Sequence, residues 1–294
     1  MNSNPLVSII CLCYNHEAFV IESLNSVINQ SYNNIELIIV DDFSTDNSKK
    51  VIRNWLINFP KTQFIGNEEN LGNTKSFNKA LRLAKGDYII DLASDDVLLP
   101  NCVHLQIEKF QKSSYPNLGV VYGNAELITE NGDFDSYYFA VNSDKEVIQK
   151  RVTGDIYHNV LLGGNSLCSV SAMIKKETLE DLNGFDEDLY YEDLDFWIRA
   201  SRKYEFDFIN AILVQKRTVE NSLGAMFYKK TDERAKKINH STYLILKKAI
   251  KLNKTKTENK ALLKRIHFEI LLNYKSKNFY LLSKYLRLKL LLSI

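Results

Sequence analysis

Strand and helix signals alternate through the first hundred residues, and this alternation restricts the chain to few folds. Residues such as Val20, Leu24 and Val27 recur at the spacing of one helix face. The intervening apolar segments are short and almost unbroken, as in strands buried on both faces of a sheet, and they cover residues 7–13, 36–40, 63–66 and 87–92. We therefore predict an α/β fold with a mostly parallel, doubly wound sheet flanked by helices.

Later segments carry weaker signals. We expect strands at residues 119–128 and 168–175, a helix at 191–203 and a long functional loop at 133–160. Ser44 or Thr45 is placed to cap the helix that follows it. Residues 97–100 are compatible with a helix start, because Pro100 suits an early helical position.

The net charge of +2 conceals a strong asymmetry along the chain. Residues 229–294 hold 18 Lys and Arg against 4 Asp and Glu, about +14, whereas residues 1–228 hold 20 against 32, about −12. We divide the chain there, into an α/β domain at 1–228 and a Lys-rich helical extension at 229–294. An acidic body favours cation chemistry and a basic extension favours an anionic surface, although a solvated helical face is equally compatible.

The cysteine content and the hydropathy of the chain indicate the cellular compartment in which the protein works. Cys11, Cys13, Cys102 and Cys168 are too few and too scattered for a disulfide framework. The N-terminus lacks the basic flank of a signal peptide, and no apolar run reaches the roughly 18 residues of a membrane span. We expect a reduced, cytoplasmic protein.

Polar side chains follow three of the predicted strands directly. In parallel sheets, ligands bind outside the carboxyl ends of the strands. One crevice is therefore expected to gather an aromatic ring, an amide and four carboxylates, namely Tyr14, Asn15, Asp41, Asp42, Asp95 and Asp96.

The adjacent carboxylates of Asp95 and Asp96 need a compensating partner, because like charges side by side repel. The chain has neither a G-x-G-x-x-G nor a G-x-x-x-x-G-K-[ST] motif for phosphate. A carboxylate pair can instead hold Mg²⁺ or Mn²⁺, which then binds phosphate. The structural alternative is a helix N-terminus at 97–100, whose dipole favours carboxylates. The five histidines show no metal-binding spacing.

Three blocks, residues 7–48, 70–100 and 183–204, resemble the family 2 glycosyltransferases in order and spacing, and the resemblance covers roughly residues 5–225. The resemblance implies a Rossmann-like fold of the GT-A type. It also implies transfer of a sugar from a nucleotide-diphosphate sugar, a UDP-sugar in our prediction, with inversion at the anomeric carbon. Because no Q-x-x-R-W follows the third block, we expect addition of single sugars to a glycan or lipid-linked acceptor in cell-surface polysaccharide synthesis.

The resemblance also assigns roles by position. Tyr14 would stack on the base, Asp42 would accept a hydrogen bond from the base, and Asp95 would contact the ribose. Asp96 would bind the metal, Mn²⁺ or Mg²⁺, and the pair Glu192-Asp193 would carry the catalytic base, with Asp193 preferred. Asn15 and Lys75 complete the predicted donor site. Lys75 is included because Phe77 stands where an Arg is common in the family, and Leu12-Cys13 also departs from a frequent Pro-Thr.

Each of these residues also has a plain structural interpretation. Asp42 could brace a turn, and Tyr14 could be a core aromatic. Asp193 lies in an acidic run that could be a solvated face, although interleaved aromatic residues argue for burial. Asp195 points elsewhere on a helix and could pair with Arg199, four residues later.

The same sequence features also bear on other functions. A sugar nucleotidyltransferase would need a Gly-rich basic loop after the first strand, which residues 14–19 lack. A catalytically inactive nucleotide-sugar-binding or partner-binding domain remains the alternative.

Nucleic acid is not expected as a partner, because the extension is mostly Lys with few Arg. The extension could instead lie on an anionic membrane at the inner face, pack on the α/β domain, or join a second copy.

Overall fold

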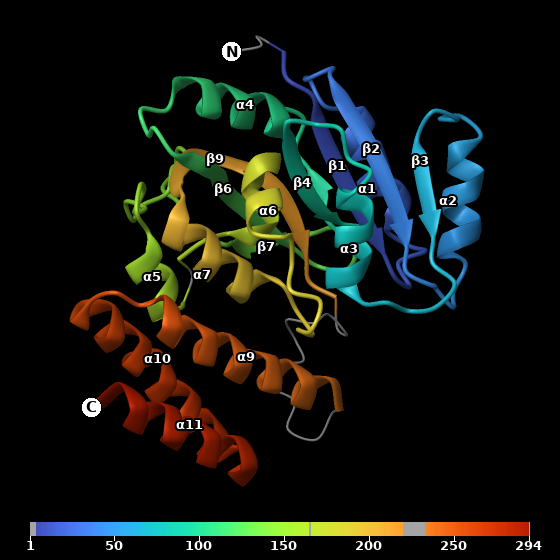
Figure 1. Cartoon of the computed structure of the whole chain (residues 1–294). Coiled ribbons are helices and arrows are strands. Elements are labelled where there is room, and N and C mark those ends of the chain that lie inside the picture. Colours follow the sequence, from blue (N-terminus) through green and yellow to red (C-terminus); the bar gives the residue numbers. More distant parts are fainter. Residues whose placement is uncertain (1–3, 165, 220–232, 294) are drawn as a thin grey trace.

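The computed structural model describes residues 4–164, 166–219 and 233–293. It shows one twisted sheet with helices on both faces, followed by a bundle of helices packed against one side (Figure 1). The predicted α/β fold with a mostly parallel sheet in its first half is confirmed.

The first half of the sheet is parallel and has the spatial order β3-β2-β1-β4. Many of its apolar side chains, Ile9, Ile38 and Ile89 among them, are fully buried, so each of these contributes roughly 1.5–3 kcal/mol of transfer free energy. The strands match the predicted ranges within one residue. They and their connecting helices are β1 (Val7–Cys13), α1 (Val20–Ile28), β2 (Ile35–Asp41), α2 (Ser48–Leu56), β3 (Gln63–Gly66), α3 (Asn73–Leu81) and β4 (Tyr88–Ala93).

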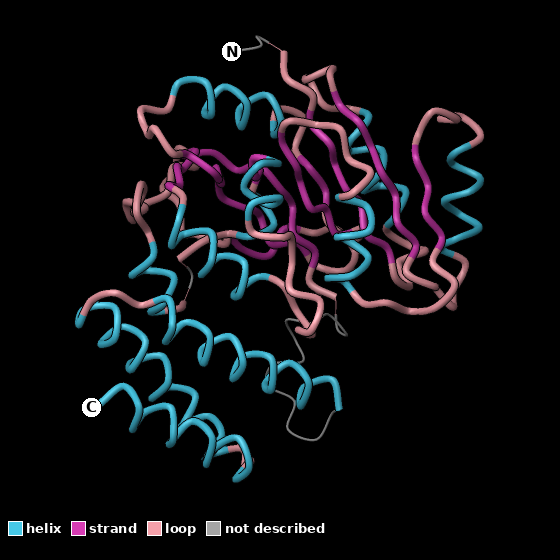
Figure 2. The backbone as a smooth tube through the Cα atoms, viewed as in Figure 1, coloured by secondary structure: helices cyan, strands magenta, loops and turns pink. Residues whose placement is uncertain are grey.

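The second half of the sheet is mixed and continues in the order β8-β6-β9-β5, with β7 beside β6. Figure 2 shows the strands of the sheet in magenta and the surrounding helices in cyan. Strand β8 is antiparallel to both β4 and β6, whereas β9 runs parallel to β6 and antiparallel to β5. This pairing brings the end of β9 close to the segment that follows β4. The strands are β5 (Val97–Leu98), β6 (Leu118–Ile128), β7 (Phe134–Tyr137), β8 (Met173–Lys175) and β9 (Glu205–Arg217).

Helices of this half lie between and beside these strands (Figure 1). They include a short 3₁₀ turn directly before β8, so only the end of the predicted strand at 168–175 is extended. The predicted loop at 133–160 contains β7 and the start of a helix. The elements are α4 (Cys102–Lys112), α5 (Tyr157–Leu162), η1 (Ser169–Ser171), α6 (Lys176–Asp181) and α7 (Asp193–Lys203).

The structure rules out the alternative of a helix N-terminus at residues 97–100, and one predicted helix cap is wrong. Residues 97–98 form β5 because they pair with Gln215 and Val214 of β9, and the next helix begins only at Cys102. Asp95 and Asp96 therefore do not sit at a helix N-terminus. The N-cap position of α2 is Asn47 rather than Ser44 or Thr45, because both hydroxyl residues bond to Asn15 at the end of β1 instead.

The C-terminal extension forms three helices, α9 (Glu233–Leu252), α10 (Lys256–Lys275) and α11 (Phe279–Ser293). They pack on the side of the α/β domain formed by α5 and α7 (Figure 1). Tyr157 Oη donates to Asn253 Oδ1 at 2.8 Å, and Arg202 pairs with Glu258 at 2.6 Å. The extension is thus joined to the domain. Within the described residues, no helix is both long and apolar enough to span a bilayer, and the four cysteines are free and buried.

Candidate active site

Two aromatic rings mark one end of the crevice, at the carboxyl ends of β1 and β2. The strands are in register, with Cys13 opposite Asp41, so Tyr14 and the residues after Asp41 are neighbours. The Tyr14 ring is 39% exposed, which excludes a core role. Phe43 is 47% exposed and has a φ of +64°, in the left-handed region that disfavours a bulky residue. Strain of this kind concentrates at functional sites, and the sequence analysis missed Phe43.

Asp42 is buried beside these rings and organises a distant loop. Its two carboxylate oxygens accept hydrogen bonds from the backbone N–H groups of Leu71 and Gly72, each at 2.9 Å, and from the side chains of Asn67 and Ser76 at 2.8 and 2.9 Å. Asp42 therefore fixes the loop that leads into α3, rather than only its own turn. Its contact with a nucleotide base stays a prediction.

The remaining predicted donor residues lie around this loop. Asn15 has a φ of +58°, and its Oδ1 accepts from Thr45 N at 2.8 Å, which ties the end of β1 to the segment after β2. Lys75 is exposed in the first turn of α3. Phe77 is instead fully buried and stacks on Phe185 at a centroid distance of 4.2 Å. Only Lys75 of this pair can reach a ligand.

Arg217 fixes the turn that carries Asp95 and Asp96. Its backbone N–H donates to Asp96 Oδ1 at 2.9 Å, and its Nε donates to the Asp95 carbonyl at 3.1 Å. The buried guanidinium also pairs with Glu22 at 2.5 Å. His16 adds a contact, because its Nδ1 lies 3.7 Å from Asp95 Oδ1. Sequence reasoning gave no role to Arg217 or His16.

Asp96 is the better placed of the two for a cation. It is 4% exposed, and its Oδ2 has no hydrogen-bond partner among the described residues. Burial, and then repulsion from Asp95, raise the pKa of Asp96 to about 8. The described residues contain no preformed cluster of three metal-ligating side chains. Mg²⁺ commonly binds proteins through one or two carboxylates plus substrate phosphates, so the pair fits such an ion.

Asp193 is the first residue of α7, and Glu192 occupies its N-cap position. Burial, and then the charge on Asp193, raise the pKa of Glu192 well above its usual range. Burial also raises the pKa of Asp193, but Lys216, the Ser169 hydroxyl and Glu192 oppose that rise. Both carboxyl groups therefore have raised pKa values, and Asp193 is the one whose ionised form Lys216 and the Ser169 hydroxyl stabilise.

Asp91 and Lys216 complete this electrostatic group. Burial and the Asp193 charge raise the pKa of Asp91, on β4, to about 8. Lys216, on β9, stabilises the ionised forms of both Asp96 and Asp193, so it lies within electrostatic reach of both ends of the crevice. Asp195, by contrast, is bound to Arg199 at 2.6 Å and to Lys248 at 3.2 Å, as the helical spacing predicted for Arg199.

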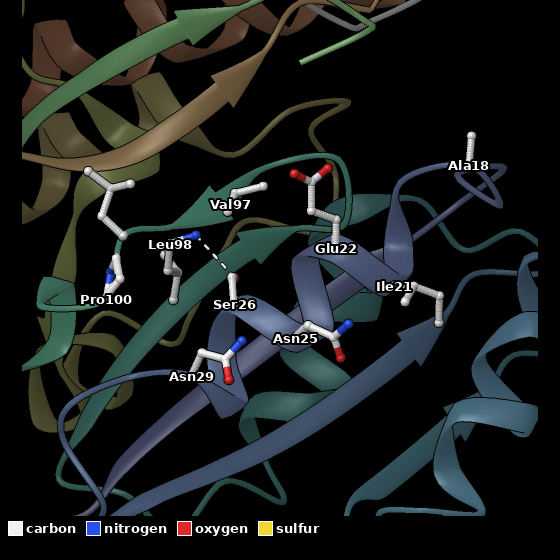
Figure 3. A pocket seen from close by; sticks show the side chains of 10 residues that line it. Ala18, Ile21, Glu22, Asn25, Ser26, Asn29, Val97, Leu98 and Pro100 are labelled. Atoms are coloured by element: carbon white, nitrogen blue, oxygen red, sulfur yellow. Dashed lines mark hydrogen bonds between the residues drawn. The ribbon is translucent and has the colours of Figure 1, made fainter. Parts of the chain in front are cut away.

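Asp193 faces a pocket of about 150 Å³. The pocket also contains Tyr138, Ser169 and Trp197 of the α/β domain and Arg265 of α10. A larger pocket, of about 580 Å³, lies between α1 and β5 and contains none of the predicted site residues (Figure 3). There Leu98 N donates to Ser26 Oγ at 3.1 Å, which holds α1 against β5. The smaller pocket is lined by Asp193, the predicted base, so it is the better candidate for a second substrate.

The site thus places the exposed rings of Tyr14 and Phe43 and the carboxyl groups of Asp95 and Asp96 after strands β1, β2 and β4, and the carboxyl group of Asp193 at the start of α7. The sequence model described as Glycosyl transferase family 2 matches residues 8–182, more than half of the chain. The chain belongs to glycosyl transferase family 2. An uncharacterized glycosyltransferase of Haemophilus influenzae is 29% identical to this glycosyltransferase over 261 residues, or 84% of this chain and 76% of that protein. Chondroitin synthase of Escherichia coli is 29% identical over 209 residues, which are 71% of this chain but only 28% of that protein.

Solved structures agree with the fold of this family 2 glycosyltransferase. TarS 1-349 of S. aureus in complex with UDP-GlcNAc has a TM-score of 0.67 at 18% identity, covering 88% of this chain and 71% of that one. The mannosyltransferase PcManGT of Pyrobaculum calidifontis, in complex with GDP-Man and Mn²⁺, has a TM-score of 0.63 at 19% identity, covering 97% and 74%. The sheet and its flanking helices therefore form a GT-A type glycosyltransferase fold.

Proposed function

We propose that this enzyme transfers a single sugar, with inversion, from a nucleotide-diphosphate sugar to a hydroxyl of a glycan or lipid-linked acceptor in cell-surface polysaccharide synthesis. The observation that carries the proposal is the position of Asp193. It begins α7 and lines a pocket of about 150 Å³ beside Ser169 and Trp197, and Lys216 opposes the rise that burial causes in its pKa. A carboxylate that lines a pocket can reach an acceptor hydroxyl there, as a general base must.

The roles of this chain's residues follow from their positions. Asp193 would take the proton from the acceptor hydroxyl as its oxygen attacks the anomeric carbon. Tyr14 and Phe43 would enclose the base, Asp95 would contact the ribose, and Lys75 would approach the diphosphate. Asp96 would hold Mn²⁺ or Mg²⁺, and the chemistry supplied there is Lewis-acid stabilisation of the departing diphosphate.

The names of the relatives support the substrate classes. TarS is described with UDP-GlcNAc and PcManGT with GDP-Man and Mn²⁺. Chondroitin synthase and a poly-β-1,6-N-acetyl-D-glucosamine synthase of Staphylococcus epidermidis make polysaccharides by name. We infer a UDP-sugar donor and a cytoplasmic reaction at the inner face of the membrane.

The experiment that tests this function is a panel of UDP- and GDP-sugars with Mn²⁺, assayed for release of nucleoside diphosphate. We expect one or two donors to be turned over, faster with acceptor present. Binding of a nucleotide sugar with no release, across the panel and with added acceptors, would instead support the alternative of a catalytically inactive binding domain.

Phe43 gives a prediction in which stability and donor affinity change in opposite directions. Phe43→Gly removes the cost of a bulky residue in the left-handed region, so we expect the free energy of unfolding to rise by about 1 kcal/mol. It also removes a ring from the base site, and base–aromatic stacking contributes about 1–3 kcal/mol, so donor affinity should fall roughly tenfold. Denaturant unfolding and calorimetric titration of UDP measure the two effects.

Lys145→Gly is the matched control, because Lys145 also has a positive φ, +61°, in a segment away from the crevice. It should raise stability without changing the affinity for UDP. Unchanged UDP affinity in Phe43→Gly would remove Phe43 from the donor site.

The outer face of the extension supports docking to an anionic membrane. Several large apolar side chains are exposed on α10 and α11, and exposed Lys264, Lys275, Arg287 and Lys289 are interspersed among them. Aromatic and Leu side chains among basic residues fit the interface of an anionic bilayer. The apolar residues are Phe268, Leu271, Tyr274, Phe279, Tyr280, Leu286, Leu290 and Leu291, each at least 45% exposed.

We expect the full chain to co-sediment with vesicles of phosphatidylserine and phosphatidylcholine at low salt, and less at high salt, since each basic residue near such a surface contributes about 1 kcal/mol. Replacing Phe279, Tyr280 and Leu290 together by Ser should abolish sedimentation without unfolding, because all three are exposed. Ile57→Ser combined with Leu83→Ser, two exposed apolar sites on the α/β domain, is the control. If the triple variant sediments like the wild type, the face has another use. Loss of a dimer in the same variant would identify self-association.

A further inference from the structure

Helix α10 of the extension contributes a wall to the pocket that contains Asp193. Arg265 lines this pocket together with Asp193, Tyr138, Ser169 and Trp197. The α/β domain therefore does not complete this pocket alone. Because Asp193 is the proposed base, the molecule that occupies this pocket is the acceptor, and this step rests on the proposed function.

The Arg265 side chain is held in place from two sides. Its Nε and Nη2 lie 3.1 and 3.0 Å from Oε1 of Glu269, one turn later on the same helix, and Glu269 is 3% exposed. Its Nη1 lies against Gly163, which ends α5 with a φ of +76°. A Cβ at Gly163 would stand 2.3 Å from Nη1, so a glycine is required for this approach. Nη1 has no hydrogen-bond acceptor among the described residues, which leaves this end of the guanidinium for a ligand.

We infer that Arg265 binds an oxyanion on the acceptor, either the carboxylate of an acidic sugar or the phosphate of a sugar phosphate. A guanidinium recognises carboxylate and phosphate with paired N–H groups. The surroundings of the pocket are otherwise rich in carboxyl groups, Asp91, Glu192 and Asp193 among them. These groups would repel an anionic acceptor, so the pocket needs a cation to bind one. Tyr138 and Trp197 supply apolar faces for the sugar ring. Arg265 is thus a specificity residue of the extension, positioned by Glu269.

Trp197 provides a local reporter of binding that does not require turnover. The chain has two tryptophans, and Trp55 lies in the core against Phe59, so Trp55→Phe leaves Trp197 as the single tryptophan. In this background we would titrate methyl β-D-glucuronide, glucose 6-phosphate and the neutral methyl β-D-glucoside. We expect the Trp197 emission to respond to an anionic sugar at lower concentration than to the neutral one. The two anionic probes distinguish carboxylate from phosphate.

Arg265→Gln combined with Glu269→Gln removes the guanidinium without leaving a buried carboxylate unpaired. The dissociation constant for the preferred anionic sugar should rise roughly 10- to 100-fold, as expected for lost hydrogen bonds to a charged group, while UDP affinity stays unchanged. Arg265→Lys keeps the charge but loses the paired donors, so its dissociation constant for this sugar should lie between those of the parent and the double variant. Lys264→Gln, a neighbouring exposed position on α10, is the matched control and should bind as the parent does.

Equal affinity for glucuronide, glucose 6-phosphate and glucoside, no response to any of them, or equal affinities in the double variant and its parent would overturn the inference. The donor panel separates this result from the proposed function. Nucleoside diphosphate release without an anion preference rejects only the Arg265 assignment. An anion preference without release at any donor rejects the proposed transfer reaction instead.

Discussion

Asp193→Asn is expected to lower kcat by about 10²–10⁴-fold, the usual cost of removing a general base, with donor affinity unchanged. The amide keeps the shape of the side chain at the start of α7 but cannot accept the acceptor proton. Donor affinity should persist because Asp193 is not one of the predicted donor contacts. Those contacts are separate residues, of which Tyr14 is the first in the sequence and Asp96 the last. Initial rates with saturating donor, together with titration of UDP, measure the two quantities.

The pH profile gives a second measure of the same role. A base must be deprotonated to act, and burial raises the pKa of Asp193. The rate of the wild type should therefore increase with pH through a pKa above that of a free carboxyl group. This acidic limb should disappear in Asp193→Asn. Glu192→Gln should keep it and lose less activity, because Asp193 and not Glu192 lines the pocket.

Asp188→Asn is the matched control, since Asp188 belongs to the same acidic run and is exposed. It should retain full activity. A near-normal kcat in Asp193→Asn would make Asp193 a structural residue, and the next candidate would be Glu192.

The parallel half of the sheet could be predicted because its information is local. Each of the first four strands is an apolar run that can be recognised from its own residues, and each helix shows its own periodicity. The carboxyl ends of such strands must meet at one edge, so Tyr14, Asp42, Asp95 and Asp96 could be placed together without knowing any side-chain contact.

The second half could not be predicted because its contacts are distant in sequence. Val97 pairs with Gln215, and Arg217 bonds to Asp96, across about 120 residues. The local pattern of residues 97–100 does not distinguish the start of a helix from a short strand that pairs with β9. The roles of Arg217 and Lys216 depend on the same pairing, so a reading of motifs alone omits them.

The roles of several side chains at the site could not be predicted for the same reason, because their partners are distant in sequence. Sequence places Asp42 at a strand end, but the groups that bind it come from residues 67–76. Arg265 reaches the pocket of Asp193 only through the packing of α10 against α5. Phe43 gave no signal at all, because its exposed ring and positive φ are properties of the backbone that follows β2.

Asp96→Asn is expected to lower turnover by about 10³-fold or more, since Lewis-acid stabilisation of a leaving group contributes several kcal/mol. Asparagine keeps the size and the hydrogen bond from Arg217 N to Oδ1, so the turn after β4 should be preserved. What it loses is a carboxylate oxygen, Oδ2, that no described residue occupies. Excess chelator should reduce wild-type turnover to the same level, and added Mn²⁺ should restore it.

A thermal shift measures the metal role without any turnover. A ligand that binds only the folded state stabilises it by about 2.7 kcal/mol at 100 times its Kd, so Mn²⁺ with UDP should raise the Tm of the wild type. In Asp96→Asn this shift should vanish, whereas Asp188→Asn should show it in full. Full wild-type activity in excess chelator, or an undiminished Mn²⁺ shift in Asp96→Asn, would contradict the assignment. The pair Asp95-Asp96 would then hold its turn through Arg217 and contact the donor without a metal, and Lys216, which acts on both Asp96 and Asp193, would be the cation left to stabilise the diphosphate.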